Sequence, residues 1–288
     1  MQVLDQMLKK YSLESIEDKK NAIKEIIQEI VLSGLARSNF FKDVAFYGGT
    51  ALRIFYDLDR FSEDLDFTLL VSNPDYEIYE YISFVKNEVE SLGLKFQIEE
   101  KTKTKSTDIK SAFLKGNTKE QFLVFYPDEN QDLSILHADE KIKVKFDIDT
   151  NPPSFASTEV KYRLLPYPYQ VRVYDLPSLF AGKIDAVLSR SWMNRVKGRD
   201  FYDYIYFLSM DIQVNIKHLK SRLVQSKFIE ESYELTRESL IEMLNQRFDQ
   251  INFEDAKKDV APFISDLNKL TLWSSDFFKE ITKNVKLS

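Results

Sequence analysis

Hydrophobic and polar positions along the chain follow two periods, one typical of helices and one of strands, and the balance between them changes near residue 175. The first long helix is predicted to begin after Ser15, which with Asp18 resembles a capping box. Apolar residues at positions 23, 26, 27, 30 and 31 then recur at helical spacing. Gly34 is expected to end this helix.

Short apolar or alternating runs predict strands over residues 43–47, 64–71, 95–99, 109–114, 121–126, 141–149 and 171–174. The run 141–149 has the clearest period of two, so its apolar side chains share one face and its polar side chains the other. A helix is predicted over residues 76–92. Gly48-Gly49 is expected to stop the first strand, with Thr50 capping a short helix. Prolines in residues 151–168 break the pattern.

After Pro177 the strand signals largely vanish, and six segments have the spacing of helices: 178–193, 199–210, 216–224, 231–248, 255–267 and 273–285. The sequence therefore predicts an α+β domain over residues 1–175, with a mixed β-sheet flanked by helices, followed by an α-helical bundle domain over residues 176–288.

Composition narrows the class of protein. The 288 residues are enough for two cores, and 43% of them are hydrophobic. The chain has no cysteine, which excludes disulfides and thiolate chemistry and fits a reducing cytoplasm. It has neither a secretory signal nor a run of about 20 apolar residues. We therefore expect a cytoplasmic protein with no membrane partner.

A formal net charge of −6 argues weakly against a protein that coats nucleic acid by bulk electrostatics. Two basic clusters are present nevertheless, and they are either solvated surface or two walls that guide a polyanion. The chain's two histidines are interpreted as surface or boundary residues. The first cluster contains Lys101, Lys103, Lys105, Lys110, Lys115 and Lys119; the second contains Arg190, Arg195, Lys197 and Arg199.

Carboxylates form the most informative pattern. Asp64 and Asp66 are two residues apart on a predicted strand, so both project from one face and repel unless a cation neutralises them. Mg²⁺ (or Mn²⁺) favours a few carboxylates together with phosphate oxygens and water. Asp147 lies on the polar face of another predicted strand and is a candidate third ligand, although Asp149 shares that face. Two ions could then assist phosphoryl chemistry.

The glycine pair lies just before these carboxylates. Gly48 and Gly49, between a strand and a helix, would let the backbone approach a phosphate, and the helix N-terminus would offer N–H groups to it. Thr50 and Ser62 add hydroxyls. A glycine pair alone is more often a simple turn, and an Asp-x-Asp strand often faces solvent. The ordered combination of both is more specific.

The run GGTALRIFYDLDRFSEDLDF, followed by LFAGKIDAVLSRSWMNRVKGRDFYDYIYFL, resembles the nucleotidyltransferases grouped with the AbiEii/AbiGii abortive-infection toxins. Their wider relatives share the DNA polymerase β-like nucleotidyltransferase fold. The resemblance covers residues 40–208. It implies a phosphate-side loop at residues 48–50, where Gly49 replaces the serine of many members. It also implies a metal-binding pair at Asp64 and Asp66, a motif lysine at Lys183, and a following acid at Asp200 or Asp203.

Physical chemistry supports the lysine independently, because an ammonium group near a triphosphate stabilises charge on the departing pyrophosphate. Lys183, Val187 and Arg190 fall along one stripe of a helix, so Arg190 could reach the same nucleotide or an RNA backbone. Lys183 could equally be an ordinary surface residue. Arg199 and Asp203 could be a simple intrahelical pair.

The resemblance implies transfer of a nucleoside monophosphate from an NTP to a hydroxyl acceptor, with RNA, in particular the 3′ end of tRNA, as the acceptor of a toxin. It also implies a cognate antitoxin encoded nearby. Two alternatives remain open: a nucleotide-binding module without transfer activity, and nucleotidylation of a small molecule such as an antibiotic.

Overall fold

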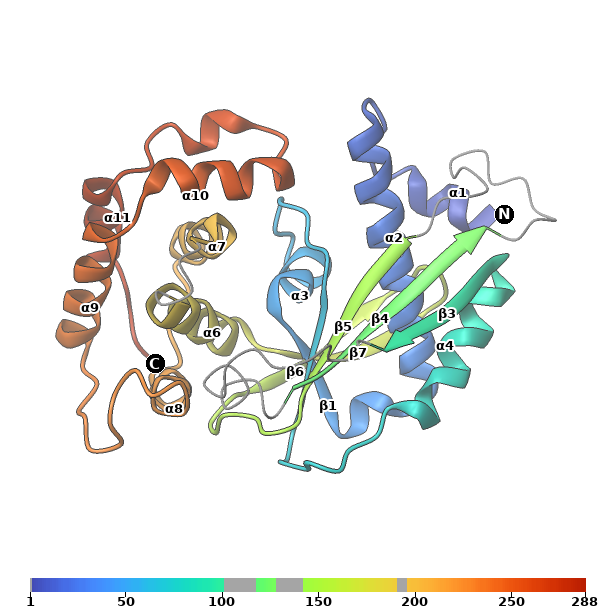
Figure 1. The fold of residues 1–288 in the computed structure, drawn as a ribbon, viewed down its shortest axis with the longest axis horizontal. Helices are drawn as coiled ribbons and strands as arrows, with labels where there is room; N and C mark the ends of the chain where they lie inside the picture. Colours follow the sequence, from blue (N-terminus) through green and yellow to red (C-terminus); the bar gives the residue numbers. More distant parts are fainter. Residues whose placement is uncertain (1, 101–117, 128–141, 191–195) are drawn as a thin grey trace. The chain divides into compact units, whose positions relative to one another are not determined.

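The computed structural model describes residues 2–100, 118–127, 142–190 and 196–288 (Figure 1). The chain divides into two compact units. The first contains residues 1–56, 61–152 and 159–173, and the second contains residues 57–60, 153–158 and 174–288. Among the described residues, no helix is both long and apolar enough to cross a bilayer.

One seven-stranded sheet forms the centre of the first unit, in the order β3-β4-β5-β2-β1-β7-β6. The central strand β2 pairs antiparallel with β1 and parallel with β5, so the sheet is mixed. The strands are β1 (Val44–Tyr47), β2 (Leu65–Leu69), β3 (Leu94–Glu100), β4 (Thr118–Pro127), β5 (Ile142–Asp149), β6 (Thr158–Arg163) and β7 (Tyr169–Tyr174).

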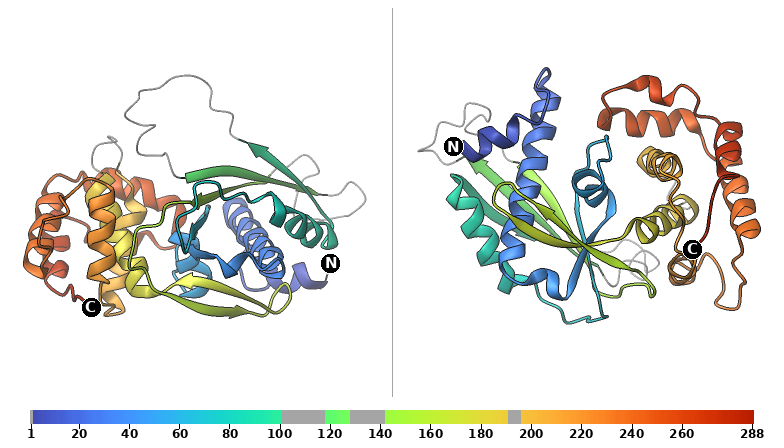
Figure 2. Two further views of the ribbon diagram at one scale, coloured as in Figure 1. Left: turned by 90° about the horizontal axis from the view of Figure 1, so that it is seen from below. Right: turned by 180° about the vertical axis from the view of Figure 1, so that it is seen from behind.

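The long helix α2 (Ile16–Arg37) packs against the sheet and lies between β4 and the β6–β7 hairpin (Figure 2). Arg163 of β6 donates two 3.1 Å hydrogen bonds to the buried carboxylate of Glu29 on α2, which fastens the hairpin to the helix. The other helices of this unit are α1 (Gln2–Leu8), the short 3₁₀ turn η1 (Phe40–Lys42), α3 (Gly48–Phe55) and α4 (Tyr79–Ser91).

Buried phenylalanine rings fill the space under the central strands. The Phe67 ring of β2 lies 4.7 Å from that of Phe146 on β5 and 5.0 Å from that of Phe46 on β1, centroid to centroid. All three side chains are at most 2% exposed. Since apolar burial is the main favourable term in folding, this cluster fixes the register in which the neighbouring polar residues of the same strands meet.

The second unit is helical. Figure 1 shows α6 and α7 near its centre, with the other helices arranged around them, and Phe180 of α6 stacks on Phe207 of α7 at 4.7 Å. The helices are α6 (Leu176–Ser189), α7 (Gly198–Ser209), α8 (Ile216–Gln225), α9 (Arg237–Asp249), α10 (Phe253–Val260) and α11 (Ser275–Thr282), with 3₁₀ turns η3 (Ala261–Phe263) and η4 (Leu267–Leu270).

These elements confirm the predicted fold class, a mixed sheet flanked by helices and followed by a helical region. The capping box at the start of α2 is also confirmed, since Ser15 accepts from the Asp18 backbone and Asp18 from that of Ser15. In β5 the side chains of Val144, Phe146 and Ile148 are buried, as the period of two predicts. The predicted strand 109–114 lies outside the described residues.

Three local predictions were wrong. Helix α2 continues past Gly34 to Arg37. The glycine serves packing and does not end the helix: it lets the backbone of α4 approach, since a Cβ there would lie 2.9 Å from the Val85 Cα. Thr50 does not cap α3, which begins at Gly48 after an N-cap at Tyr47. The proline-containing stretch, predicted to be irregular, includes the strand β6. Its inward side chains are polar and form hydrogen bonds, whereas apolar inward side chains are the usual sign of a strand.

Candidate nucleotide site

The turn from β1 into α3 places Gly48 directly beneath the carboxylate of Asp66. Gly48 has φ +83°, and a Cβ on it would lie 2.3 Å from Asp66 Oδ2. Tyr47, the residue before it, is the register partner of Asp66 across β1 and β2. Only glycine has the space and the backbone freedom for this position. Gly48, the first residue of the glycine pair, must therefore be glycine to leave space for the Asp66 carboxylate, whether or not a phosphate binds there.

Asp66 and Asp147 are register partners on the parallel strands β2 and β5. Partner residues on neighbouring strands lie about 4.8 Å apart and project from the same face, so the two carboxylates form one row. Lys145, two residues earlier on β5, is ion-paired to Asp147. Asp149 instead accepts a 2.9 Å hydrogen bond from the Asn151 backbone N–H at the turn after β5.

The segment that leads into β2 is held by three contacts from other elements. Gln28 of α2 donates a 3.1 Å hydrogen bond to the Ser62 carbonyl, and Lys24 of α2 pairs with the Glu63 carboxylate at 2.8 Å. The Thr50 hydroxyl donates to the Asp64 carbonyl, and Thr50 is fully buried. The Thr50 hydroxyl therefore binds the backbone at the first residue of the carboxylate pair.

Two polar groups in this region have no partner among the described residues. The carboxylate of Asp64, which is partly buried, makes no hydrogen bond or ion pair with any of them, and neither does the Ser62 hydroxyl. Asp64 lies two residues before Asp66, which is itself partly buried, and its carbonyl contacts Thr50 in the first turn of α3. Carboxylate oxygens are ligands for hard cations, and a hydroxyl group can donate to a phosphate.

The donor set can be tested against a divalent cation. Within the described residues, no group of three or more His, Cys, Asp or Glu side chains is gathered closely enough to hold a metal ion. Asp64 and Asp66 nevertheless supply two carboxylates of the kind Mg²⁺ takes when it keeps phosphate oxygens and water as its other ligands. The residues present therefore fit a metal that arrives with a nucleotide.

A second set of candidate residues lies in the second unit, around Asp203 of α7. This carboxylate is fully buried and accepts from Lys183 of α6, whose Nζ lies 2.7 Å from Oδ2. Arg60 donates from Nε and Nη2 to the two oxygens of the same carboxylate, each at 2.6 Å. Asp203 is therefore the acid nearest to the predicted motif lysine, one of the two positions that the sequence left open.

Asp200 lies one turn earlier on α7 and belongs to the same cluster. Its Oδ2 accepts from Arg190 Nη1 at 2.6 Å, and its Oδ1 lies 3.7 Å from Lys183 Nζ. Burial opposes ionisation of Asp200, but the cations Arg190, Lys183 and Lys197 outweigh it and lower its pKa. Lys183 and Arg190 thus approach the same carboxylate, that of Asp200.

Charge is not balanced in the ion pairs of this cluster, since three cations (Arg60, Lys183 and Arg190) face two carboxylates (Asp200 and Asp203), and the charge of Lys197 also acts on Asp200. Burial opposes the charge of Arg60, but Asp203 more than compensates and raises its pKa, so the guanidinium stays charged. The Lys183 side chain is 14% exposed and that of Arg190 is 47% exposed. These two groups can present the surplus positive charge to an anion.

Sequence reasoning missed Arg60. It lies in a run of charged residues, DLDR, that reads equally well as a surface loop, and its partner is 143 residues away. Of the basic clusters, residues 101–115 and Arg195 lie outside the described residues, as does the side chain of Lys119. The sequence also allowed a simple intrahelical pair of Arg199 with Asp203. In the structure Arg199 stacks over the Phe263 ring at 4.2 Å, and the Asp203 oxygens accept from Arg60 and Lys183.

The interpretation of the histidines as surface or boundary residues can be compared with the structure at one of the two positions. His137 lies outside the described residues. His218 is fully buried, with Nδ1 2.8 Å from the Ser154 carbonyl and its ring edge-on to Tyr174. Burial, together with Arg222, lowers its pKa to about 4. His218 is thus a neutral core residue and was wrongly placed at the surface.

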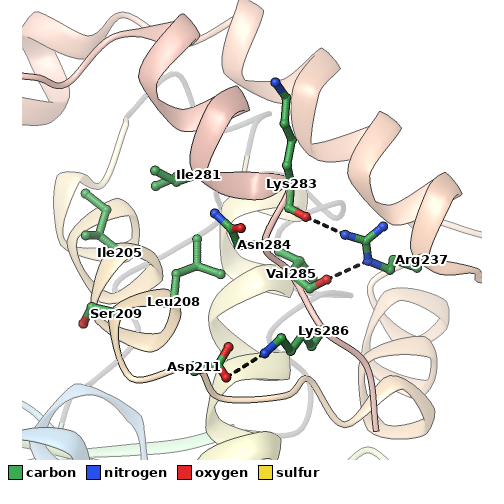
Figure 3. Close-up of a pocket in the computed structure, with 10 residues that line it drawn as sticks. All are labelled: Ile205, Leu208, Ser209, Asp211, Arg237, Ile281, Lys283, Asn284, Val285 and Lys286. Carbon is green, nitrogen blue, oxygen red and sulfur yellow. Dashed lines mark hydrogen bonds and ion pairs between the residues drawn. The ribbon is translucent and has the colours of Figure 1, made fainter.

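Two hollows open on α7 within the second unit. The first, of about 510 Å³, is lined by α7, Arg237 of α9 and the segment after α11 (Figure 3). Its polar groups serve the fold, because Arg237 donates to the Val285 and Lys283 carbonyls and Lys286 pairs with Asp211. None of the predicted site residues lines it.

The second hollow, of about 480 Å³, lies beside the segment that carries Arg60. Asp57 and Asp59 line it together with the rings of Tyr202, Tyr206 and Trp273. Tyr202 donates a 2.8 Å hydrogen bond to Asp59. Burial and the negative charges nearby, that of Asp57 foremost among them, raise the pKa of Tyr206 to about 12. Lys269 also lines the hollow and is ion-paired to Asp59, so the hollow is aromatic and contains charges of both signs.

The sequence was compared with models of known protein families. The model of the nucleotidyl transferase AbiEii toxin of type IV toxin–antitoxin systems matches residues 30–280. The chain belongs to this family of nucleotidyltransferase toxins. No curated protein matches the sequence.

Among solved structures, two from Helicobacter pylori are similar. One is described as a candidate nucleotidyltransferase, with 19% identity and a TM-score of 0.49 over 91% of this chain and 95% of the other. The second is the protein JHP933, with the same identity and TM-score over 92% of this chain and 93% of its own. The family assignment depends on the family model and not on these structures.

Proposed function

We propose that the protein transfers a nucleoside monophosphate from an NTP to a hydroxyl group of RNA, with the 3′ end of tRNA as the acceptor, in the cytoplasm. The observation that carries this proposal is the row of Asp66 and Asp147 on paired strands, with the unpartnered Asp64 carboxylate beside it. Membership of a nucleotidyltransferase toxin family supports the reaction class, and it supports a cognate antitoxin encoded nearby.

In this proposal the acceptor oxygen attacks the α-phosphorus, the bond from that phosphorus to the β-phosphate bridging oxygen breaks, and pyrophosphate leaves. Asp64 and Asp66 hold Mg²⁺ or Mn²⁺, which when bound neutralises charge on the phosphates. Asp147 takes the proton from the acceptor hydroxyl or assists the carboxylate pair. The N–H groups of residues 48–50 and the Ser62 hydroxyl bind phosphate oxygens.

Lys183 stabilises negative charge on the departing pyrophosphate, with Asp200 and Asp203 holding it and Arg190 adding positive charge.

The experiment is incubation of the purified protein with Mg²⁺, total cellular RNA and each of the four α-labelled NTPs. We expect label in RNA from the native protein and at least a 1,000-fold lower rate from Asp66→Asn, which keeps the shape of the side chain. Equal labelling by both proteins, with unchanged melting temperature, would refute the assignment of Asp66. A label found in tRNA alone would identify the acceptor class.

One observation favours a different acceptor. The second hollow has three aromatic rings and the Asp57 carboxylate beside the Asp59–Lys269 ion pair, and the rings and the Asp57 carboxylate suit a cationic small molecule such as an aminoglycoside-type antibiotic. Mass spectrometry of the acceptor after reaction separates this alternative from RNA. Binding of an NTP in calorimetry without transfer to either acceptor would instead support a nucleotide-binding module.

A further inference from the structure

Arg60 is the largest fully buried side chain of the described residues, only 2% exposed. It ends the segment 57–60, which belongs to the second unit. Its guanidinium makes two parallel hydrogen bonds of 2.6 Å to Asp203, which is itself fully buried. Bidentate pairs of this kind fix both the position and the orientation of a carboxylate.

The same carboxylate also holds Lys183. Its Nζ lies 2.7 Å from Asp203 Oδ2, the oxygen to which Arg60 Nη2 donates. Arg60 is too buried to touch a ligand, whereas the Lys183 side chain retains some exposure. One carboxylate is therefore shared between a cation that is sealed in the fold and a cation that can reach a ligand.

We propose that Arg60 is a positioning residue for nucleotide transfer, which orients Asp203 and offsets its charge so that Lys183 is fixed in place yet keeps positive charge for a phosphate. This inference rests on the proposed function, in which Lys183 meets the triphosphate.

The net charge of the cluster depends on Arg60 and Lys183 sharing the Asp203 carboxylate. With Arg60 present, the ion-paired groups carry one positive charge more than the two carboxylates cancel, in addition to the charge of Lys197. Without Arg60, Lys183 would pair with Asp203 and Arg190 with Asp200, so the ion-paired groups would have no surplus. Because interactions between charges are strong where water is excluded, a cluster that has lost one positive charge attracts a polyanion much less.

A purely structural role is the competing reading, since removing one partner of a buried ion pair destabilises a protein whatever its function. A compensating double variant separates the two readings. Arg60→Gln removes one positive charge from the ion-paired groups, and Arg60→Gln combined with Asp203→Asn restores their net charge, because Lys183 and Arg190 then face Asp200 alone. The double variant also leaves no buried charge without a partner, so it tests the idea even if the single variant fails to fold.

The measurement is calorimetric titration with Mg²⁺ and inorganic tripolyphosphate, a probe that has no base and undergoes no nucleotidyl transfer. Relative to the native protein, we expect binding at least tenfold weaker in Arg60→Gln and recovery to within about threefold in the double variant. Arg60→Lys, which keeps the charge, should lie between them. Arg222→Gln is the matched control and should bind normally, because it breaks a different ion pair, that of Arg222 on α8 with Asp185 on α6.

Binding by a folded Arg60→Gln that equals native binding would overturn the inference, and so would a double variant tenfold weaker than the native protein. The KM for the NTP should rise with the loss of tripolyphosphate binding. Lys183→Gln separates this inference from the proposed function. If that variant binds and transfers normally, the role proposed for Lys183 fails, and that of Arg60 with it; if it loses both while Arg60→Gln loses neither, only the role of Arg60 is refuted. Absence of transfer by the native protein, with tripolyphosphate binding intact, would instead refute the proposed function.

Discussion

The carboxylate of Asp66 occupies the space where a side chain at Gly48 would begin, 2.3 Å from the position of a Cβ. Gly48→Ala should therefore displace the carboxylate. It should also strain the backbone at φ +83°, a conformation that costs an L-residue about 1–2 kcal/mol. We expect transfer activity to fall at least 100-fold, measured as incorporation of labelled NTP, with a lower melting temperature.

Gly182→Ala provides the matched control. A Cβ at that helical glycine would make only ordinary contacts, the nearest at 3.7 Å from Arg222. Alanine is the better helix former by about 0.5–1 kcal/mol, so this variant should be slightly more stable and retain activity within about threefold. Full activity in Gly48→Ala would contradict the proposed role of Asp66.

Thr50 offers a second test, because its buried hydroxyl donates to the Asp64 carbonyl. Thr50→Val keeps the shape and removes the donor, so the free energy of unfolding of the protein without nucleotide should fall by about 1–3 kcal/mol. Thr50→Ser should lose much less. If urea unfolding shows no difference between Thr50→Val and the native protein, the hydroxyl does not hold the Asp64 backbone.

The two acids on β5 should differ. Asp147 is the register partner of Asp66, whereas Asp149 caps the turn at Asn151. Asp147→Asn should lower kcat at least 100-fold with little change in melting temperature. Asp149→Asn should leave kcat within about threefold and act on stability instead. The opposite result, with Asp149 essential to transfer, would move the third acid to that position.

His218 predicts a pH dependence of stability. Its pKa in the fold is about 4, below the ordinary 6.5, so unfolding takes up a proton between these values. The stabilisation is complete above pH 6.5 and is lost as the pH falls through 4. It amounts to about 3 kcal/mol by the usual conversion. Over this range the native protein should lose about that much more stability than His218→Gln, and parallel curves would show that the histidine is not buried neutral.

Much of the candidate site is predictable because it depends on local periods. A period of two puts Asp64 and Asp66 on one face, and helical spacing puts Lys183 and Arg190 on one stripe. These regularities need no knowledge of distant residues. The parallel pairing of β2 with β5 then brings Asp147 beside Asp66. The alternation of polar and apolar residues predicts the face on which each aspartate lies, but it does not predict which strands pair or in which register.

The rest depends on long-range packing. Nothing in the run around Arg60 indicates a partner 143 residues away, and a single histidine between lysine and leucine gives no sign of burial. Strand β6 was missed because its inward face is polar: Glu159 accepts from Tyr56 and Arg163 pairs with Glu29. Strand prediction from hydrophobic periodicity expects apolar residues at these inward-facing positions.

The central claim is that Asp64, Asp66 and Lys183 serve one triphosphate. The most direct measurement is anomalous diffraction from crystals grown with Mn²⁺ and a non-hydrolysable NTP analogue. We predict a manganese peak about 2.1–2.2 Å from oxygens of both aspartates, in keeping with the coordination distances of hard cations. A phosphate oxygen should lie within about 3.2 Å of Lys183 Nζ, as a hydrogen bond requires. Manganese bound away from the two aspartates, or a triphosphate that does not reach Lys183, would contradict the account.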